Sequence, residues 1–180
     1  GPYALWLRLS CKAPITSPEK PQLLHQFQTG KLDTATITSL NFLLEDRAKG
    51  HCQLDSNTLE ELFNALIHNP DPHTNFYLNY LYRLYATFQA QERHYLQAVQ
   101  TAEQSLALMD QPQVRLNQVE WLIAANHLEE AQTYLLKIRT TLSPLTAVLY
   151  AKWIDLLALK IKLLQEVQQQ VKSSSPPLRP

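Results

Sequence analysis

The sequence predicts an all-α fold of antiparallel helical hairpins, and three observations support this prediction. Only three glycines occur among the 180 residues, whereas hydrophobic residues make up 45% of the chain. Apolar residues recur at three- and four-residue spacing, the period of an α-helix, along most of the sequence. The eleven prolines gather near the ends and between helical segments, where they mark boundaries. We therefore expect a single helical domain, or one with short appendages.

Residues 1–20 are predicted to be such an appendage. The opening Gly-Pro pair is typical of the scar that protease cleavage of an expression tag leaves. The apolar lead-in over 3–10 is too short to cross a bilayer, and a proline-containing linker follows it. The lead-in fits either a first segment that packs on the domain or the remnant of a juxtamembrane segment, since Tyr3 and Trp6 suit a membrane interface.

Residues 21–72 are predicted to hold three N-terminal helices, over 21–28, 34–49 and 57–68. Gly30 and Gly50 are expected to end the first two helices. Asn57, with Glu60 three residues later, has the spacing of a capping box and is expected to cap the third. The proline that follows Asn69 should prevent the third helix from continuing.

Residues 73–140 are predicted to form two consecutive helical hairpins, with helices over 73–91, 92–109, 113–125 and 128–140. Their matching alanines, Ala98 and Ala131, lie 33 residues apart. The tyrosine-rich first helix has two apolar stripes, so we expect it to lie between neighbours on both sides. Asn126 is expected to take the left-handed conformation in the turn of the second hairpin.

Residues 141–172 are predicted to form a C-terminal helix that caps the two hairpins. Ser143 suits the N-cap position, with Pro144 at the first helical position. One apolar face is expected from its large side chains, namely Leu149, Trp153, Leu156, Leu157, Ile161 and Leu164. Residues 173–180 show no packing signal and are expected to form an extended or flexible tail.

The two hairpins resemble tetratricopeptide repeats, whose period is about 34 residues. Ala98 and Ala131 stand where that family has a small residue that lets two helices pack closely. Asn126 stands where the family often has glycine, whereas Arg93 replaces the turn glycine of the first unit and Asp110 its closing proline. The resemblance covers about residues 73–140 and implies a superhelical interaction module with flanking capping helices.

The wider layout resembles the C-terminal soluble domains of bacterial membrane-embedded glycan polymerases, ligases and oligosaccharyltransferases, including O-antigen ligases. The apolar lead-in, a Cys-Gln-Leu-Asp element at 52–55 and the Asn69-Pro70 pair carry this resemblance. It implies that glycan transfer belongs to a membrane-embedded part of a longer parent chain. This domain would then face the periplasm and bind a protein partner or a glycan acceptor. The alternative is a stand-alone cytosolic scaffold protein of the tetratricopeptide type.

No catalytic residue, cofactor or metal ligand set is predicted. Sixteen basic side chains balance sixteen acidic ones, so the basic face that nucleic acid requires is not indicated. The sequence contains no phosphate-binding glycine loop, nucleophile elbow, zinc-protease motif or CxxC pair. His68 and His73 flank a proline-rich turn around Asp71, but two histidines in a turn do not make a metal site. The fragment is therefore predicted to bind rather than to catalyse.

Four tyrosines and an arginine are the candidate binding residues: Tyr77, Tyr80, Tyr82, Arg83 and Tyr85. One buried stripe does not require so many tyrosines. Aromatic rings can stack on sugars or grip a peptide, and the arginine can add hydrogen bonds. The alternative is that these rings pack in the core with their hydroxyl groups at its rim.

Cys11 and Cys52 are the only cysteines and could form a disulfide. A bridge between them would close a loop of about 40 residues and stabilise the domain by ~3–4 kcal/mol. It would require an oxidising compartment such as the periplasm. The alternative, two reduced and buried thiols, suits the cytosol.

Overall fold

A computed structural model describes residues 18–174 of the chain. Regular structure in this described part is entirely helical, which confirms the predicted all-α class. The chain divides into two compact units, with the boundary between Asp110 and Gln111. The boundary falls between the two predicted hairpins, so each unit contains one of them.

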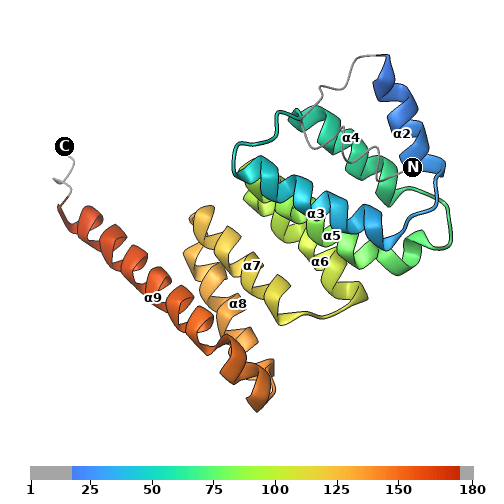
Figure 1. The fold of residues 1–180 in the computed structure, drawn as a ribbon. Coiled ribbons are helices and arrows are strands. Elements are labelled where there is room, and N and C mark those ends of the chain that lie inside the picture. Colours follow the sequence, from blue (N-terminus) through green and yellow to red (C-terminus); the bar gives the residue numbers. More distant parts are fainter. Residues whose placement is uncertain (1–17, 175–180) are drawn as a thin grey trace. The chain divides into compact units, whose positions relative to one another are not determined.

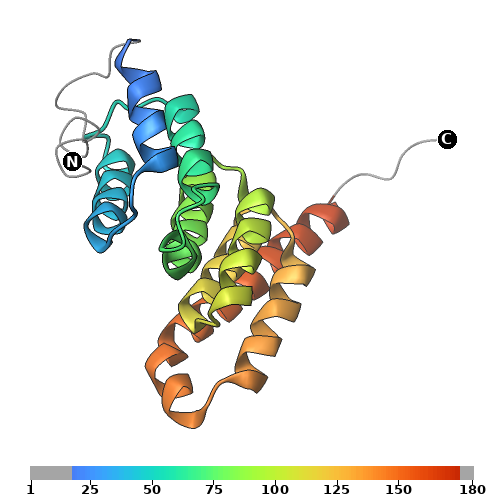
Figure 2. The same cartoon turned by 90° about the vertical axis from the view of Figure 1, so that its right-hand side faces the viewer.

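Unit 1 contains five described helices: α2 (Glu19–Thr29), α3 (Thr34–Ala48), α4 (Ser56–Ile67), α5 (Thr74–Gln91) and α6 (Tyr95–Leu108). α2 packs beside α4 (Figure 2), α3 and α4 both pack on α5, and α5 forms a long antiparallel pair with α6 (Figure 1). α5 is therefore covered from both sides, as its two apolar stripes predict.

Aromatic side chains fill the centre of unit 1. The Phe63 ring of α4 stacks on the Phe88 ring of α5 with centroids 5.7 Å apart, and both rings are buried. Leucines from the first four described helices surround them in one continuous cluster. On the other side of α5, the Ser105 hydroxyl of α6 donates to the Asn79 carbonyl at 2.8 Å. This bond satisfies a buried polar pair where the two helices approach closely.

Aspartates, rather than the predicted Asn57, cap two helices of unit 1. The Asp55 carboxylate accepts the Thr58 backbone N–H at 2.6 Å, so α4 starts at Ser56 and Asn57 lies inside its first turn. Asp33 caps α3 in the same way. Both caps supply an acceptor for otherwise unsatisfied N–H groups. α2 also begins at Glu19, two residues before the predicted start, because Pro21 fits within a first helical turn.

Unit 2 contains the described helices α7 (Pro112–Ala124), α8 (Leu128–Thr141) and α9 (Pro144–Ser174). α7 and α8 form a hairpin, and α9 packs on both (Figure 1). Ser143 caps α9, since its hydroxyl accepts the Thr146 N–H at 3.3 Å, which confirms the predicted cap. The helix runs to Ser174, so the predicted tail is helical at 173–174; residues 175–180 lie outside the described part.

The turns of the two hairpins have the same geometry 33 residues apart. Arg93 and Asn126 take left-handed φ values of 63° and 62°. In each turn the next residue, His94 or His127, donates its N–H to the carbonyl five positions back, at 2.9 and 2.8 Å. This pattern is a Schellman motif, which ends a helix on a left-handed residue. The structure is thus compatible with a helical repeat, and it confirms the predicted conformation of Asn126.

Candidate functional site

Two of the predicted binding tyrosines belong to the core of unit 1. Tyr77 and Tyr85 are half-buried and pack against its hydrophobic cluster. The Tyr85 ring stacks on Phe63 at a centroid distance of 5.3 Å, and its hydroxyl donates to the Glu60 carboxylate. Burial, together with the hydrogen bond to Glu60 and the charge of that carboxylate, raises the pKa of Tyr85 to about 12. Tyr85 therefore links α4 to α5 in this structure.

Tyr80 and Arg83 lie on the outer stripe of α5 together with Phe76. The three residues are four and three positions apart, the spacing of one helical face. The Phe76 ring is 74% exposed and meets the Tyr77 ring edge to face at 5.0 Å. Tyr82 is half-buried and, by helical spacing, is not on this stripe. Of the five predicted residues, Tyr77 and Tyr85 thus belong to the core, whereas Tyr80 and Arg83 share the outer stripe with Phe76, which was not predicted.

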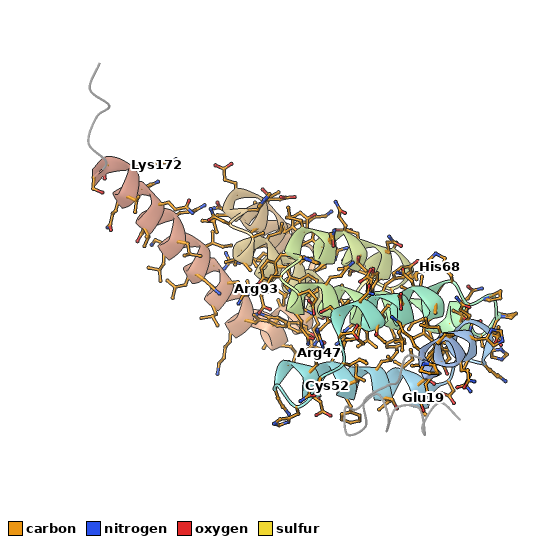
Figure 3. The ribbon with its side chains drawn as sticks, turned by 90° about the horizontal axis from the view of Figure 1, so that it is seen from above. Glu19, Arg47, Cys52, His68, Arg93 and Lys172 are labelled. Carbon is orange, nitrogen blue, oxygen red and sulfur yellow. The ribbon has the colours of Figure 1, made fainter. Side chains whose placement is uncertain are left out.

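A polar cluster joins the ends of α3 and α5 near Cys52. The Arg47 guanidinium donates to the Leu54 carbonyl at 3.2 Å and to the Ser56 hydroxyl at 2.9 Å, and it pairs with Glu92. Arg47 and Cys52 lie close together in Figure 3 and line a groove of about 610 Å³. Because the guanidinium already bonds acceptors within the chain, we interpret this cluster as a structural link between α3 and α5.

The structure records Cys52 as disulfide-bonded. The only other cysteine in the chain is Cys11, which lies outside the described residues. The predicted Cys11–Cys52 pairing, and with it the oxidising compartment, stays a prediction.

α9 packs on its hairpin with only one of two apolar faces. Ile154, Leu157 and Ile161 are buried at 4%, 3% and 2% exposure. On the same side, the Trp153 indole N–H donates to the Glu120 carboxylate of α7 at 2.8 Å. Spacings of three and four residues place these side chains on one face toward α7 and α8.

The opposite face of α9 is apolar and exposed. Eight of the fifteen exposed large hydrophobic side chains in the described part belong to it: Leu145, Val148, Leu149, Leu156, Leu159, Leu163, Val167 and Val171. Leu149 is 75% exposed and Leu156 is 62% exposed. The predicted single apolar face is therefore wrong, because adjacent residues such as Leu156 and Leu157 point about 100° apart on a helix.

A polar groove of about 680 Å³ lies where the C-terminal half of α9 meets the turn of the α7–α8 hairpin. The Gln168 amide of α9 donates to the Asn126 side chain at 2.6 Å, and Gln165 donates to Gln132 of α8 at 3.3 Å. Lys172, near the end of α9 (Figure 3), also lines the groove. These amides mainly bond one another, so the groove fastens the end of α9 to the hairpin.

Two exposed surfaces of the described residues are the candidate sites: the outer stripe of α5 and the second apolar face of α9. The described residues contain no group of three metal-ligating side chains. None of the described helices is long and apolar enough to cross a bilayer. No protein-family model, curated protein or solved structure matches the chain. The exposed apolar face of α9 is thus the most pronounced candidate site, because contiguous apolar surface of this extent marks interaction sites.

Proposed function

We propose that this chain is a non-catalytic helical interaction domain that binds a protein through the exposed apolar face of α9. The observation that carries this proposal is the second apolar face, which runs from Leu145 to Val171 opposite the buried one. Hydrophobic burial is the main favourable term in protein association. A helix with this face exposed therefore gains free energy when another apolar surface covers it.

Two contexts remain for such a domain. The resemblance noted above favours a periplasmic accessory domain of a membrane-embedded glycan-transfer enzyme. A stand-alone cytosolic scaffold of the tetratricopeptide type is the alternative. The complete reading frame distinguishes them, because an enzyme of the first kind has several spans of about 20 apolar residues upstream of this domain.

A second candidate surface is the outer stripe of α5, where Phe76, Tyr80 and Arg83 lie together. An exposed aromatic side chain beside an arginine suits a glycan acceptor or a peptide. Tyr80→Ala should weaken such binding without unfolding the chain, since its ring is 37% exposed. Unchanged affinity for a verified ligand in Tyr80→Ala would exclude this surface.

Photo-cross-linking in cells tests the α9 interface. A photoreactive amino acid at Leu156 should form a cross-link to whatever covers the face, and mass spectrometry identifies the product. The same amino acid at Leu136 of α8 is the matched control, because both leucines are 62% exposed. Cross-links at position 156 and none at 136 support the proposal. No cross-link at 156 in a correctly folded and expressed chain contradicts it.

A further inference from the structure

We propose that the exposed apolar face of α9 pairs in antiparallel orientation with the same face of a second copy of the chain. This inference rests on the proposed function and names the partner. Three properties of α9 support it: the spacing of its exposed leucines, its length and the arrangement of its charges.

The exposed face of α9 has the seven-residue pattern of a coiled coil. Leu149, Leu156 and Leu163 lie seven residues apart. A second set of seam positions alternates with these leucines. It begins at Leu145, four residues before Leu149, repeats every seven residues and includes Leu159. Two helices with apolar residues at both sets of positions form a left-handed coiled coil, in which the apolar side chains of one helix pack into the holes between side chains of the other. The pattern spans three heptads and is separate from the buried face that binds α7 and α8.

The length of α9 suits such a pairing. Its 31 residues extend over about 46 Å at the α-helical rise of 1.5 Å per residue. The exposed stripe runs along most of this length, from Leu145 to Val171. A seam of this extent offers apolar contacts along several helical turns to a second helix.

Charges within the seam favour antiparallel pairing. Lys152 and Glu166 occupy the two seam positions between 145 and 166 that are not apolar. A parallel pair places Lys152 against Lys152 and Glu166 against Glu166, which repels. An antiparallel pair centred between Leu156 and Leu159 brings Lys152 within one turn of Glu166 on the second copy. Opposite charges then meet at both ends of the seam.

Charges beside the seam support the same orientation. Asp155 and Lys162 lie on the same flank of α9, and Asp155 is exposed although it contacts Arg139 at 3.4 Å. In the antiparallel pair, Asp155 lies opposite Lys162 of the second copy, and two-fold symmetry repeats this contact.

The test compares the molar mass of the 180-residue chain with that of two glutamate variants by light scattering. Wild type should form a dimer. Leu156→Glu should be a folded monomer, because it introduces charge into the seam but lies outside the core of unit 2. Leu136→Glu, with equal exposure in the native chain, should remain a dimer. A wild-type monomer up to millimolar concentration, or a dimer that survives Leu156→Glu, would overturn the proposal.

A charge exchange tests the orientation. In Lys162→Glu, the new carboxylate lies opposite Asp155 of the second copy, and the two-fold symmetry repeats this repulsion. The dimer dissociation constant of the variant should therefore rise by about tenfold. Combining it with Asp155→Lys should restore the constant to within about threefold of wild type. Lys160→Glu is the control, because Lys160 lies on the opposite flank. If the dimer dissociation constant of the double variant is no lower than that of Lys162→Glu, the antiparallel arrangement is overturned.

Two results separate this inference from the proposed function. A monomeric chain whose Leu156 site cross-links to a different protein overturns self-pairing but leaves the interaction domain standing. A monomeric chain that binds phosphatidylcholine–phosphatidylglycerol vesicles, and loses that binding in Leu156→Glu, overturns both protein-based proposals. Circular dichroism confirms that each variant is folded.

Discussion

α5 and α9 both carry apolar side chains on two faces, but the structure covers both faces only in α5. In unit 1, Leu81 and Phe88 of α5 are buried with the helices α3 and α4, and α6 packs on the other side. In unit 2, Leu157 and Ile161 of α9 are buried on its hairpin, whereas the opposite leucines are exposed. The same sequence pattern thus gives an inner helix in one place and a candidate interface in the other.

The largest expected effect is on the covered helix. Phe88→Ala should lower the free energy of unfolding by about 3–5 kcal/mol, because the ring is buried among Phe63, Tyr85 and leucines and its loss leaves a cavity. Urea denaturation followed by circular dichroism measures the loss. A cost below about 1 kcal/mol would mean that α5 is not held as an inner helix.

Two neighbouring leucines of α9 sharpen the comparison within one helix. Leu157→Ala should lower the free energy of unfolding by about 2–4 kcal/mol, since Leu157 is buried against the hairpin. Leu156→Ala should change it by less than about 0.5 kcal/mol when the chain is diluted below the dissociation constant of the proposed dimer. Equal losses in the two variants would show that both faces of α9 are packed within one chain.

Polar contacts fix the C-terminal end of α5 to α3 through Arg47 and Glu92. Burial acts to raise the pKa of Glu92, but hydrogen bonds from Ser56 and Arg47 and the positive charge of Arg47 outweigh it and lower the pKa below 4.5. A carboxylate with a lowered folded-state pKa stabilises the fold above its unfolded pKa. This contribution disappears as pH falls through the folded-state value.

Glu92→Gln should therefore lower the free energy of unfolding by roughly 0.5–1 kcal/mol at pH 7. The difference from wild type should diminish as pH falls below about 4.5. Urea denaturation at pH 7 and pH 3 gives both values. A difference that is the same at the two pH values would show that the ion pair does not account for the effect.

A stabilising change of similar size is expected at the turn that brings α6 back onto α5. Arg93 has a φ of 63°, a conformation that glycine adopts without a steric cost. Arg93→Gly should raise the free energy of unfolding by about 0.5–1 kcal/mol. Thermal unfolding measures this change. Asn126→Gly is the comparison at the equivalent turn, and its gain should be smaller because asparagine tolerates this conformation.

Much of the helical layout could be predicted because it depends on local chemistry. Gly50, Asn126 and Ser143 mark turns or caps as predicted, since glycine, asparagine and serine have strong backbone preferences. The cap at Asp55 was missed, because Asn57 two residues later offers an equally good local signal. Local sequence cannot decide between two possible capping residues that lie two positions apart.

The candidate interface could not be predicted in the same way. Leu149, Leu156 and Leu157 are equally apolar in sequence, and their periodicity fits a helix. Which of them has a neighbour depends on tertiary packing, so a single apolar face was assigned where the structure has two. The tyrosines show the same limit, because Tyr85 packs in the core while Tyr80 is exposed.

Disulfide trapping between two variants tests most directly whether the uncovered face of α9 pairs with itself. Lys152→Cys and Leu163→Cys occupy one layer of the antiparallel seam, so oxidising a mixture of the two chains should give the mixed 152–163 disulfide as the main new product. Peptide mass spectrometry distinguishes this product from any bridge that involves the native cysteines. Only 152–152 and 163–163 bridges would indicate a parallel pair, and no bridge at all would contradict self-pairing.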